Sequence, residues 1–209
     1  MSGNAAKSEV EGVPESRLRL FCALDPPEPV VNAITSWQRG QEGVSERLRP
    51  VRPDSLHMTV AFLGDQPEAE VDAIAGVVEG IESRPIPARL RVEPVPVPRR
   101  RPRLFALEAE SPAAEQLAGE LGDELTALGV FRRPKRPFWP HLTVFRVRGR
   151  AEAGRPAGRL DPLPGGDGHA FGFVRLALYR SELRPEGSKY SRLAARHLPQ
   201  SGGPQEEVN

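Results

Sequence analysis

LHMTVAFLG at residues 56–64 and PHLTVFRV at residues 140–147 are two copies of one pattern, in which a histidine is followed by a large apolar residue, a threonine and a valine. The two histidines, His57 and His141, lie 84 residues apart. This spacing suits two lobes of similar construction. Because side chains alternate along a strand, each copy places its histidine and its threonine on one face and its core-forming residues on the other.

The rest of the chain alternates between strand patterns and helix patterns. Apolar and alternating runs predict strands over residues 17–24, 56–64, 88–93, 104–108, 141–148, 171–179 and 189–195. Apolar residues at helical spacing predict helices over about 29–39, 67–82 and 112–128. Several neighbouring strands are joined by short turns, such as the proline- and arginine-rich turn at 94–102. This order predicts an α+β fold with antiparallel or mixed sheets and flanking helices.

Composition and charge restrict the class of protein. The chain has 209 residues, of which 38% are hydrophobic and 27% charged, as in a soluble globular unit. The net charge is +1, so any nucleic-acid binding must come from a local basic cluster. The single cysteine, Cys22, lies in an apolar run, which predicts a buried thiol in a reducing compartment. No stretch resembles a membrane span or a signal peptide, so a cytoplasmic protein is predicted.

The two ends of the chain are polar and show no hydrophobic period. They predict disordered tails at 1–16 and 199–209 around one domain at 17–198. Nothing in the sequence requires more than one copy of this domain, and a monomer is expected.

The repeated pattern suggests phosphoryl transfer by a paired acid and base. If two lobes pack about a pseudo-twofold axis, two imidazoles converge with the hydroxyls of Thr59 and Thr143. One neutral histidine would remove a proton from the attacking oxygen while a protonated one gives a proton to the leaving oxygen, and the hydroxyls would bond the phosphate oxygens. The main chemical rival is a metal site, but no further Cys, His or acidic residue lies at ligand spacing to either histidine. No metal is therefore expected.

These motifs resemble those of the 2H phosphoesterase superfamily, and within it those of the RNA 2′,3′-cyclic phosphodiesterase (tRNA-ligase-like) family. The resemblance covers about residues 17–198. It rests on RLFCAL at 19–24, VRPDSLHMTVAFLG at 51–64, RPFWPHLTVFR at 136–146, and LYRSEL at 178–183 followed by Lys189-Tyr190. It implies two similar α+β lobes around a central cleft, each contributing one His-x-Thr strand.

The resemblance also implies a reaction and a role for each residue. The reaction is hydrolysis of a 2′,3′-cyclic phosphate, on RNA or on a small nucleotide, to a 2′-phosphate without a metal or nucleotide cofactor. By position, His57 would be the general acid that protonates O3′, and His141 the general base that activates water. Thr59, Thr143 and Arg146 would hold the phosphate. On strand parity, however, Arg146 faces away from His141 unless the strand twists or ends there.

Three aromatic residues are candidates for stacking on a base. Phe138 precedes the second motif in a proline-framed loop, and Tyr190 follows the last turn. Phe62 lies on the face opposite His57 by strand parity, so packing in the core is favoured for it.

Two basic clusters could contact an RNA backbone. One, consisting of Arg132, Arg133, Lys135 and Arg136, adjoins the second motif, and Arg136 is its candidate for RNA contact. The other consists of Arg99, Arg100, Arg101 and Arg103. Such runs usually form only a solvated surface. Contact with the RNA phosphate backbone is the more specific hypothesis, and the first cluster is the better candidate for it.

Two other functions fit the same motifs. A 2′,5′ RNA ligase acting on tRNA-like halves would use the same histidines in the reverse sense. A non-catalytic nucleotide- or RNA-binding module would keep the cleft for recognition alone, but such a module would not need a matched acid and base.

Overall fold

The computed structural model describes residues 16–41, 47–148, 160–166, 168–184 and 187–200. The two tails predicted from the sequence lie outside these residues, apart from Ser16, Pro199 and Gln200. Within the described ranges, no helix has the length and apolar character that crossing a membrane requires.

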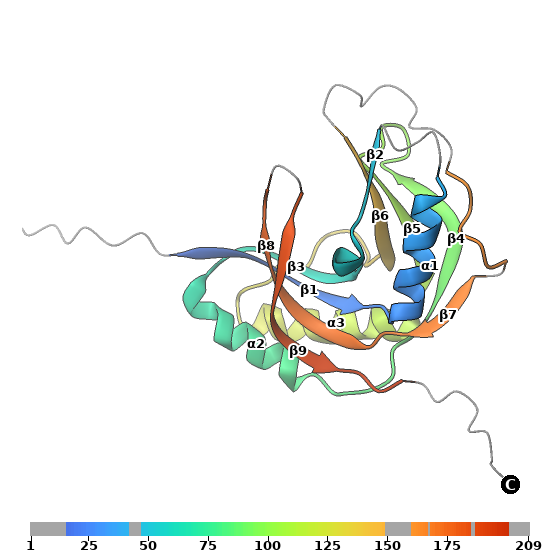
Figure 1. Ribbon diagram of the computed structural model, residues 1–209. Coiled ribbons are helices and arrows are strands. Elements are labelled where there is room, and N and C mark those ends of the chain that lie inside the picture. Colours follow the sequence, from blue (N-terminus) through green and yellow to red (C-terminus); the bar gives the residue numbers. More distant parts are fainter. Residues whose placement is uncertain (1–15, 42–46, 149–159, 167, 185–186, 201–209) are drawn as a thin grey trace, which may run out of the picture.

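Two antiparallel sheets form the framework (Figure 1). The four-stranded sheet has the order β3-β1-β8-β9 and consists of β1 (Arg17–Asp25), β3 (Met58–Pro67), β8 (Arg175–Glu182) and β9 (Lys189–His197). The five-stranded sheet has the order β2-β6-β5-β4-β7 and consists of β2 (Leu48–Pro50), β4 (Pro87–Val97), β5 (Leu104–Glu110), β6 (His141–Val147) and β7 (His169–Gly172). The predicted α+β class is confirmed, although the chain passes repeatedly between the sheets, so that the lobes are interleaved along the sequence.

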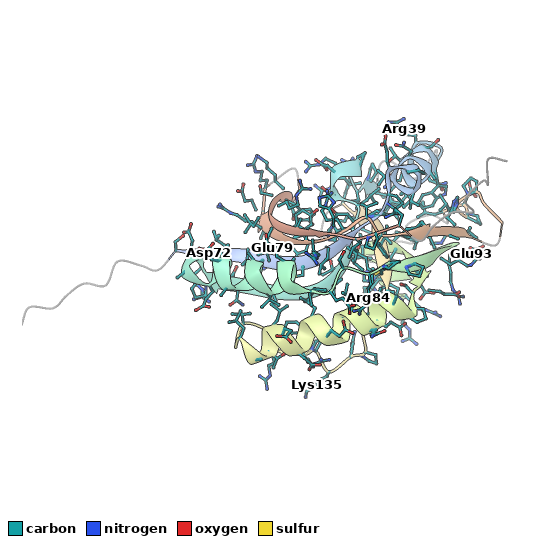
Figure 2. The ribbon with its side chains drawn as sticks, turned by 90° about the horizontal axis from the view of Figure 1, so that it is seen from below. Arg39, Asp72, Glu79, Arg84, Glu93 and Lys135 are labelled. Carbon is teal, nitrogen blue, oxygen red and sulfur yellow. The ribbon has the colours of Figure 1, made fainter. Side chains whose placement is uncertain are left out.

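Three helices cover these sheets. The helix α1 (Glu28–Arg39) packs on the five-stranded sheet, with the Trp37 ring 5.5 Å from that of Phe145 in β6. The helices α2 (Val71–Gly80) and α3 (Pro112–Ala127) lie side by side beneath the four-stranded sheet (Figures 1 and 2). The Ser111 hydroxyl caps α3 by accepting a bond of 3.1 Å from the Ala114 amide, and α3 then buries Leu117, Leu121 and Leu125 on one stripe.

A β-bulge follows the threonine of the first histidine motif. In the pairing of β1 with β3, Ala23 lies opposite Thr59 and Cys22 lies opposite Ala61, which leaves Val60 as an extra residue. Val60 and Ala61 are consecutive and both buried, so the alternation of faces is reversed beyond them. Cys22 is fully buried as predicted, and this burial raises the pKa of its thiol to about 12.

The second motif carries an equivalent bulge at the equivalent place. In the pairing of β5 with β6, Ala106 lies opposite Thr143 and Phe105 lies opposite Phe145, with Val144 as the extra residue. Val144 and Phe145 are again consecutive and buried. The two strands therefore share the repeat not only in sequence but also in its local irregularity.

Several predicted boundaries differ from the structure: β3 spans Met58–Pro67 in place of the strand predicted at 56–64, and α2 spans Val71–Gly80 in place of the helix predicted at 67–82. Two further boundaries are wrong for identifiable reasons. The predicted strand 171–179 is broken, because the buried Phe173 lies where the chain leaves the five-stranded sheet as β7 and enters the four-stranded sheet as β8. The predicted turn at 94–102 begins later, because Pro94 and Pro96 belong to β4. β7 pairs only with residues 87–90 of β4, so among the described residues the edge of β4 opposite β5 has no paired strand beside Pro94 and Pro96. Prolines are tolerated on such an edge because no neighbouring strand there requires their missing N–H groups.

Candidate active site

The two histidine strands meet at one hollow, although they belong to different sheets. β3 and β6 lie close together, and a cavity of about 300 Å³ opens beside them. Its lining includes His57, Thr59, His141 and Thr143, the four polar residues of the repeat. The structure thus brings together the side chains that strand alternation predicts to face one way.

Both imidazoles are held in the same manner. The Nδ1 of His57 lies 2.8 Å from the carbonyl oxygen of Ser55, and the Nδ1 of His141 lies 2.7 Å from that of Trp139. Because a carbonyl only accepts hydrogen bonds, each Nδ1 carries the proton, and Nε2 is the nitrogen left for chemistry. The Nε2 of His57 lies 3.1 Å from the Thr59 hydroxyl.

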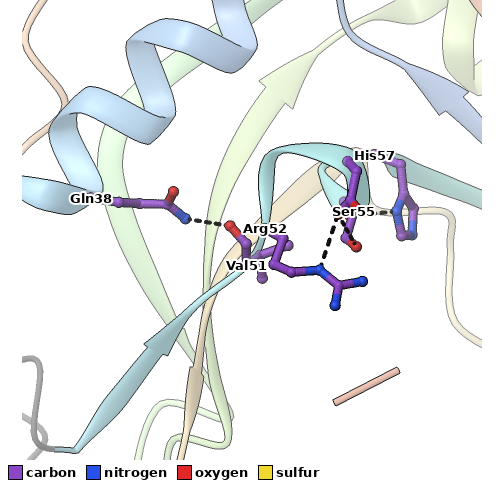
Figure 3. Close-up of polar contacts among 6 residues, drawn as sticks. Gln38, Val51, Arg52, Ser55 and His57 are labelled. Carbon is purple, nitrogen blue, oxygen red and sulfur yellow. Dashed lines mark hydrogen bonds and ion pairs between the residues drawn. The ribbon is translucent and has the colours of Figure 1, made fainter. Parts of the chain in front are cut away.

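A short turn fixes the approach to the first histidine (Figure 3). This 3₁₀ turn spans Pro53–Ser55 and is braced by Arg52, whose Nε donates to the Asp54 carboxylate at 3.2 Å. One step earlier, the Gln38 amide of α1 donates to the carbonyl oxygens of Val51 at 3.2 Å and of Val144 in β6 at 2.6 Å. A buried glutamine therefore ties the segment before the first motif to the strand of the second.

Aromatic rings pack against both imidazoles. The centroid of the Phe21 ring lies 4.9 Å from that of His57, and the Tyr190 ring meets His57 edge-on at 5.3 Å. The Trp139 indole is stacked on His141 at 4.0 Å, with an interplanar angle of 18°. The same indole donates from Nε1 to the Glu108 carboxylate at 2.9 Å, so its own orientation is fixed.

Burial depresses the basicity of both histidines. It lowers the pKa of His57 to about 4, against opposing contributions from the Ser55 carbonyl and from the Asp25 carboxylate. It also lowers the pKa of His141, against the Trp139 carbonyl and the Glu108 carboxylate. Both imidazoles are therefore mainly neutral at neutral pH in the free protein.

The Asp25 carboxylate is itself anchored. It accepts a hydrogen bond from the Tyr179 hydroxyl at 2.8 Å and an ion-paired bond from Arg175 Nε at 2.7 Å. The Phe21 ring is stacked on Tyr179 at 5.3 Å, and the His57 ring itself lies 6.4 Å from the Tyr179 ring. The negative charge that acts on the His57 imidazole is thus held at a fixed position by two donors.

The two bulges bring Arg146 and Phe62, each three residues after its motif threonine, into the hollow. For Arg146 this removes the parity mismatch, because the extra residue Val144 returns it to the face of Thr143. For Phe62 the expected packing in the core is wrong, because the side chain is 50% exposed and its ring is covered on one side by the Arg19 guanidinium at 4.6 Å. Strand periodicity alone could not reveal either placement.

The hollow is basic. Besides Arg19 and Arg146, its lining includes Arg49 and Arg52, and no acidic side chain among the described residues lines it. Four guanidinium groups around two imidazoles make a site for an anion. The described residues contain no group of three or more His, Cys, Asp or Glu that could hold a metal ion.

The residues predicted to stack on a base or to contact RNA lie in two different cavities. Tyr190 lines the hollow. Phe138 and Arg136 do not line it and belong to an adjoining groove. The sequence interpretation missed Phe21 and Glu108, whose contacts with the motif residues come from strands β1 and β5.

Known proteins resemble this chain in sequence and in fold. The family model described as LigT like Phosphoesterase matches residues 24–103. The RNA 2′,3′-cyclic phosphodiesterase of Thermus thermophilus is 34% identical over 183 residues, which cover 83% of this chain and 87% of the relative. That of Methanothermobacter thermautotrophicus is 30% identical over 181 residues, with 84% of this chain and 96% of the relative covered.

The chain belongs to the LigT-like phosphoesterase family. It is therefore an enzyme, and its fold is that of this family. The crystal structure of TT0787 of Thermus thermophilus matches with a TM-score of 0.72 at 30% identity and covers 87% of this chain and 98% of that one. The crystal structure of Escherichia coli LigT complexed with 3′-AMP matches with a TM-score of 0.69 at 27% identity and covers 88% of this chain and all of that one.

Proposed function

We propose that this LigT-like phosphoesterase hydrolyses the 2′,3′-cyclic phosphate of an RNA end or of a small nucleotide to a 2′-phosphate. The observation that carries the proposal is the matched pair of imidazoles, each with Nδ1 bound to a carbonyl and Nε2 left for chemistry, in a hollow lined by four arginines. Relatives from two organisms carry the name of this activity, and Escherichia coli LigT was crystallised with 3′-AMP, a nucleotide that also carries a phosphate on the ribose.

In the proposed mechanism, His141 acts as the general base. Its neutral Nε2 takes a proton from a water molecule, whose oxygen attacks phosphorus in line with the leaving O3′. The Trp139 carbonyl holds the opposite nitrogen and stabilises the imidazolium as it forms. The Glu108 carboxylate lies on the same side and favours the same charged state.

His57 acts as the general acid in the same step. Its Nε2 proton passes to O3′ as the bond between phosphorus and O3′ breaks, which leaves the phosphate on O2′. Since the pKa of His57 is about 4 in the free protein, this role requires that the substrate anion raise it. The reaction ends with a neutral His57 and a protonated His141, and exchange with water restores the starting state.

The other residues of the hollow hold the substrate in this proposal. Thr59 and Thr143 donate their hydroxyls to the non-bridging phosphate oxygens, and Arg146 neutralises the developing charge. Tyr190 and Phe62 offer ring surfaces to the base, a contact that does not depend on sequence. No step requires a metal or a nucleotide cofactor.

The test uses the whole purified chain with cytidine 2′,3′-cyclic phosphate in the presence of a chelator. We expect release of cytidine 2′-phosphate and a loss of at least about a hundredfold in kcat for each of His57→Ala and His141→Ala. Undiminished turnover in either variant would contradict the assigned roles. A 3′-phosphate product would show that the leaving oxygen is O2′, and activity that disappears with the chelator would contradict the metal-free mechanism.

A further inference from the structure

A second groove begins where the active-site hollow ends. It has a volume of about 560 Å³ and lies between residues 60–62 of β3, one face of α3 and the segment 131–138. Phe62 lines both the hollow and the groove, so its ring marks the boundary between them. Apart from Phe62, no residue of this groove takes part in the proposed hydrolysis of a mononucleotide.

The walls of the groove are basic and partly aromatic. Arg132, Lys135 and Arg136 line it with exposed side chains, and none of the three makes an ion pair or hydrogen bond with any residue that the structure describes. Arg133 is different, because it is paired with Asp123 at 2.6 Å. Lys135 lies beside α3 at the edge of the molecule, open to solvent (Figure 2).

Aromatic rings form the apolar part of the same groove. Phe138 and Phe131 are half-buried and packed on the core, so that each ring is rigid and still reachable from the groove. One carboxylate, that of Glu115 on α3, also lies in the lining. Three unpaired cations therefore face one anion, with aromatic surfaces between them.

We infer that this groove binds the single-stranded RNA that precedes the cyclic phosphate. The inference rests on the proposed function: a cyclic phosphate ends the strand at its 3′ side, so every further nucleotide lies 5′ of it and must leave the hollow along the surface. Proteins hold single strands without reading their sequence by combining cationic side chains, which contact the phosphates, with aromatic rings, on which the bases stack. Arg132, Lys135 and Arg136 take the phosphates, and Phe138 takes a base.

The experiment compares a long substrate with a short one. The double variant Arg132→Ala/Lys135→Ala is assayed on a ten-nucleotide RNA with a 2′,3′-cyclic phosphate end and on cytidine 2′,3′-cyclic phosphate. Its matched control is Arg39→Ala/Arg89→Ala, which removes the same charge from exposed positions on α1 and β4, outside both cavities. Each protein is measured at several salt concentrations.

We expect KM for the ten-nucleotide RNA to rise at least about fivefold in the groove variant relative to KM for the mononucleotide. The slope of log KM against log salt should fall by about 1.4, as for two lost contacts with single-strand phosphates. The control variant should leave the ratio of the two KM values as in the unmodified protein. An unchanged ratio in the groove variant, or an equal change in the control, would overturn the inference.

A binding measurement separates failure of this inference from failure of the proposed function. The anisotropy of a fluorescent ten-nucleotide RNA with a 2′-phosphate end reports binding without requiring turnover. Weaker binding by the groove variant than by the control supports the groove even if the protein does not hydrolyse the cyclic phosphate. Equal binding by the two variants contradicts the groove even if hydrolysis proceeds.

Discussion

The charge of His57 is the property of the site that is most open to direct measurement. Burial lowers its pKa from 6.5 to about 4, so about one free molecule in a thousand carries the imidazolium at pH 7. The proposed general acid must carry that proton. We therefore expect His57 to titrate near pH 4 in the free protein and at least two pH units higher when a phosphate monoester occupies the hollow.

The direction of this change follows from the groups around the imidazole. Besides burial, which is the largest cause, the charge of Arg146 and, whenever it is protonated, that of His141 lower the pKa of His57, whereas Asp25 raises it. A bound phosphate adds negative charge on the side of Nε2 and neutralises Arg146, so it opposes both unfavourable contributions. By linkage, the affinity for the anion should increase as the pH falls through the raised pKa of the complex towards the free value of about 4.

Long-range ¹H–¹⁵N correlation spectra of the two imidazoles are suited to this measurement. The His57→Gln variant assigns the signals, and circular dichroism at each pH shows that the chain remains folded. Titrations are compared without ligand and with cytidine 2′-phosphate, the expected product. A midpoint near 6.5 in the free protein, or a midpoint that the nucleotide leaves unchanged, would refute the reasoning.

Three further predictions concern residues outside the proposed catalytic pair. Replacing Trp139 by Phe keeps a ring on His141 but loses the bond to Glu108, whereas replacing it by Leu also loses the stack. We therefore expect kcat to fall about threefold for Trp139→Phe and about tenfold for Trp139→Leu. The limb of the pH–kcat profile that reports His141 should also be displaced. Equal pH–kcat profiles for the two variants would contradict a positioning role for Trp139. Gly64 has φ +71°, and an added Cβ would meet only the Phe62 ring, at the ordinary contact distance of 3.9 Å. Backbone strain alone should therefore make Gly64→Ala lower the free energy of unfolding, measured in urea, by about 1–2 kcal/mol. Gly76→Ala in α2, where the helical backbone is ordinary and the space is open, should instead stabilise the protein by about 0.5–1 kcal/mol, and a loss there would contradict that comparison.

Several features of the fold could be predicted because they depend on neighbours in the sequence. The helix α3 follows from a stripe of leucines and from a serine that caps its first turn, and both signals lie within one segment. The strand that contains Cys22 follows from its continuous apolar run. The break at Phe173 could not be predicted, because an apolar run does not show that its two halves pair with different sheets.

Within the site too, some features of the repeated His-x-Thr motif depend on the sequence alone and others depend on the tertiary structure. Its alternation by itself determined that His57 and Thr59 share a face, since that depends only on the pleat of one strand. Whether residues beyond the threonine face the hollow was decided by the tertiary structure, because a bulge is defined by pairing with another strand. The extra residues Val60 and Val144 exist only relative to β1 and β5, which lie elsewhere in the sequence. The lowered pKa of the buried imidazole likewise has no local signature, because burial and the placement of distant charges come only from the folded chain.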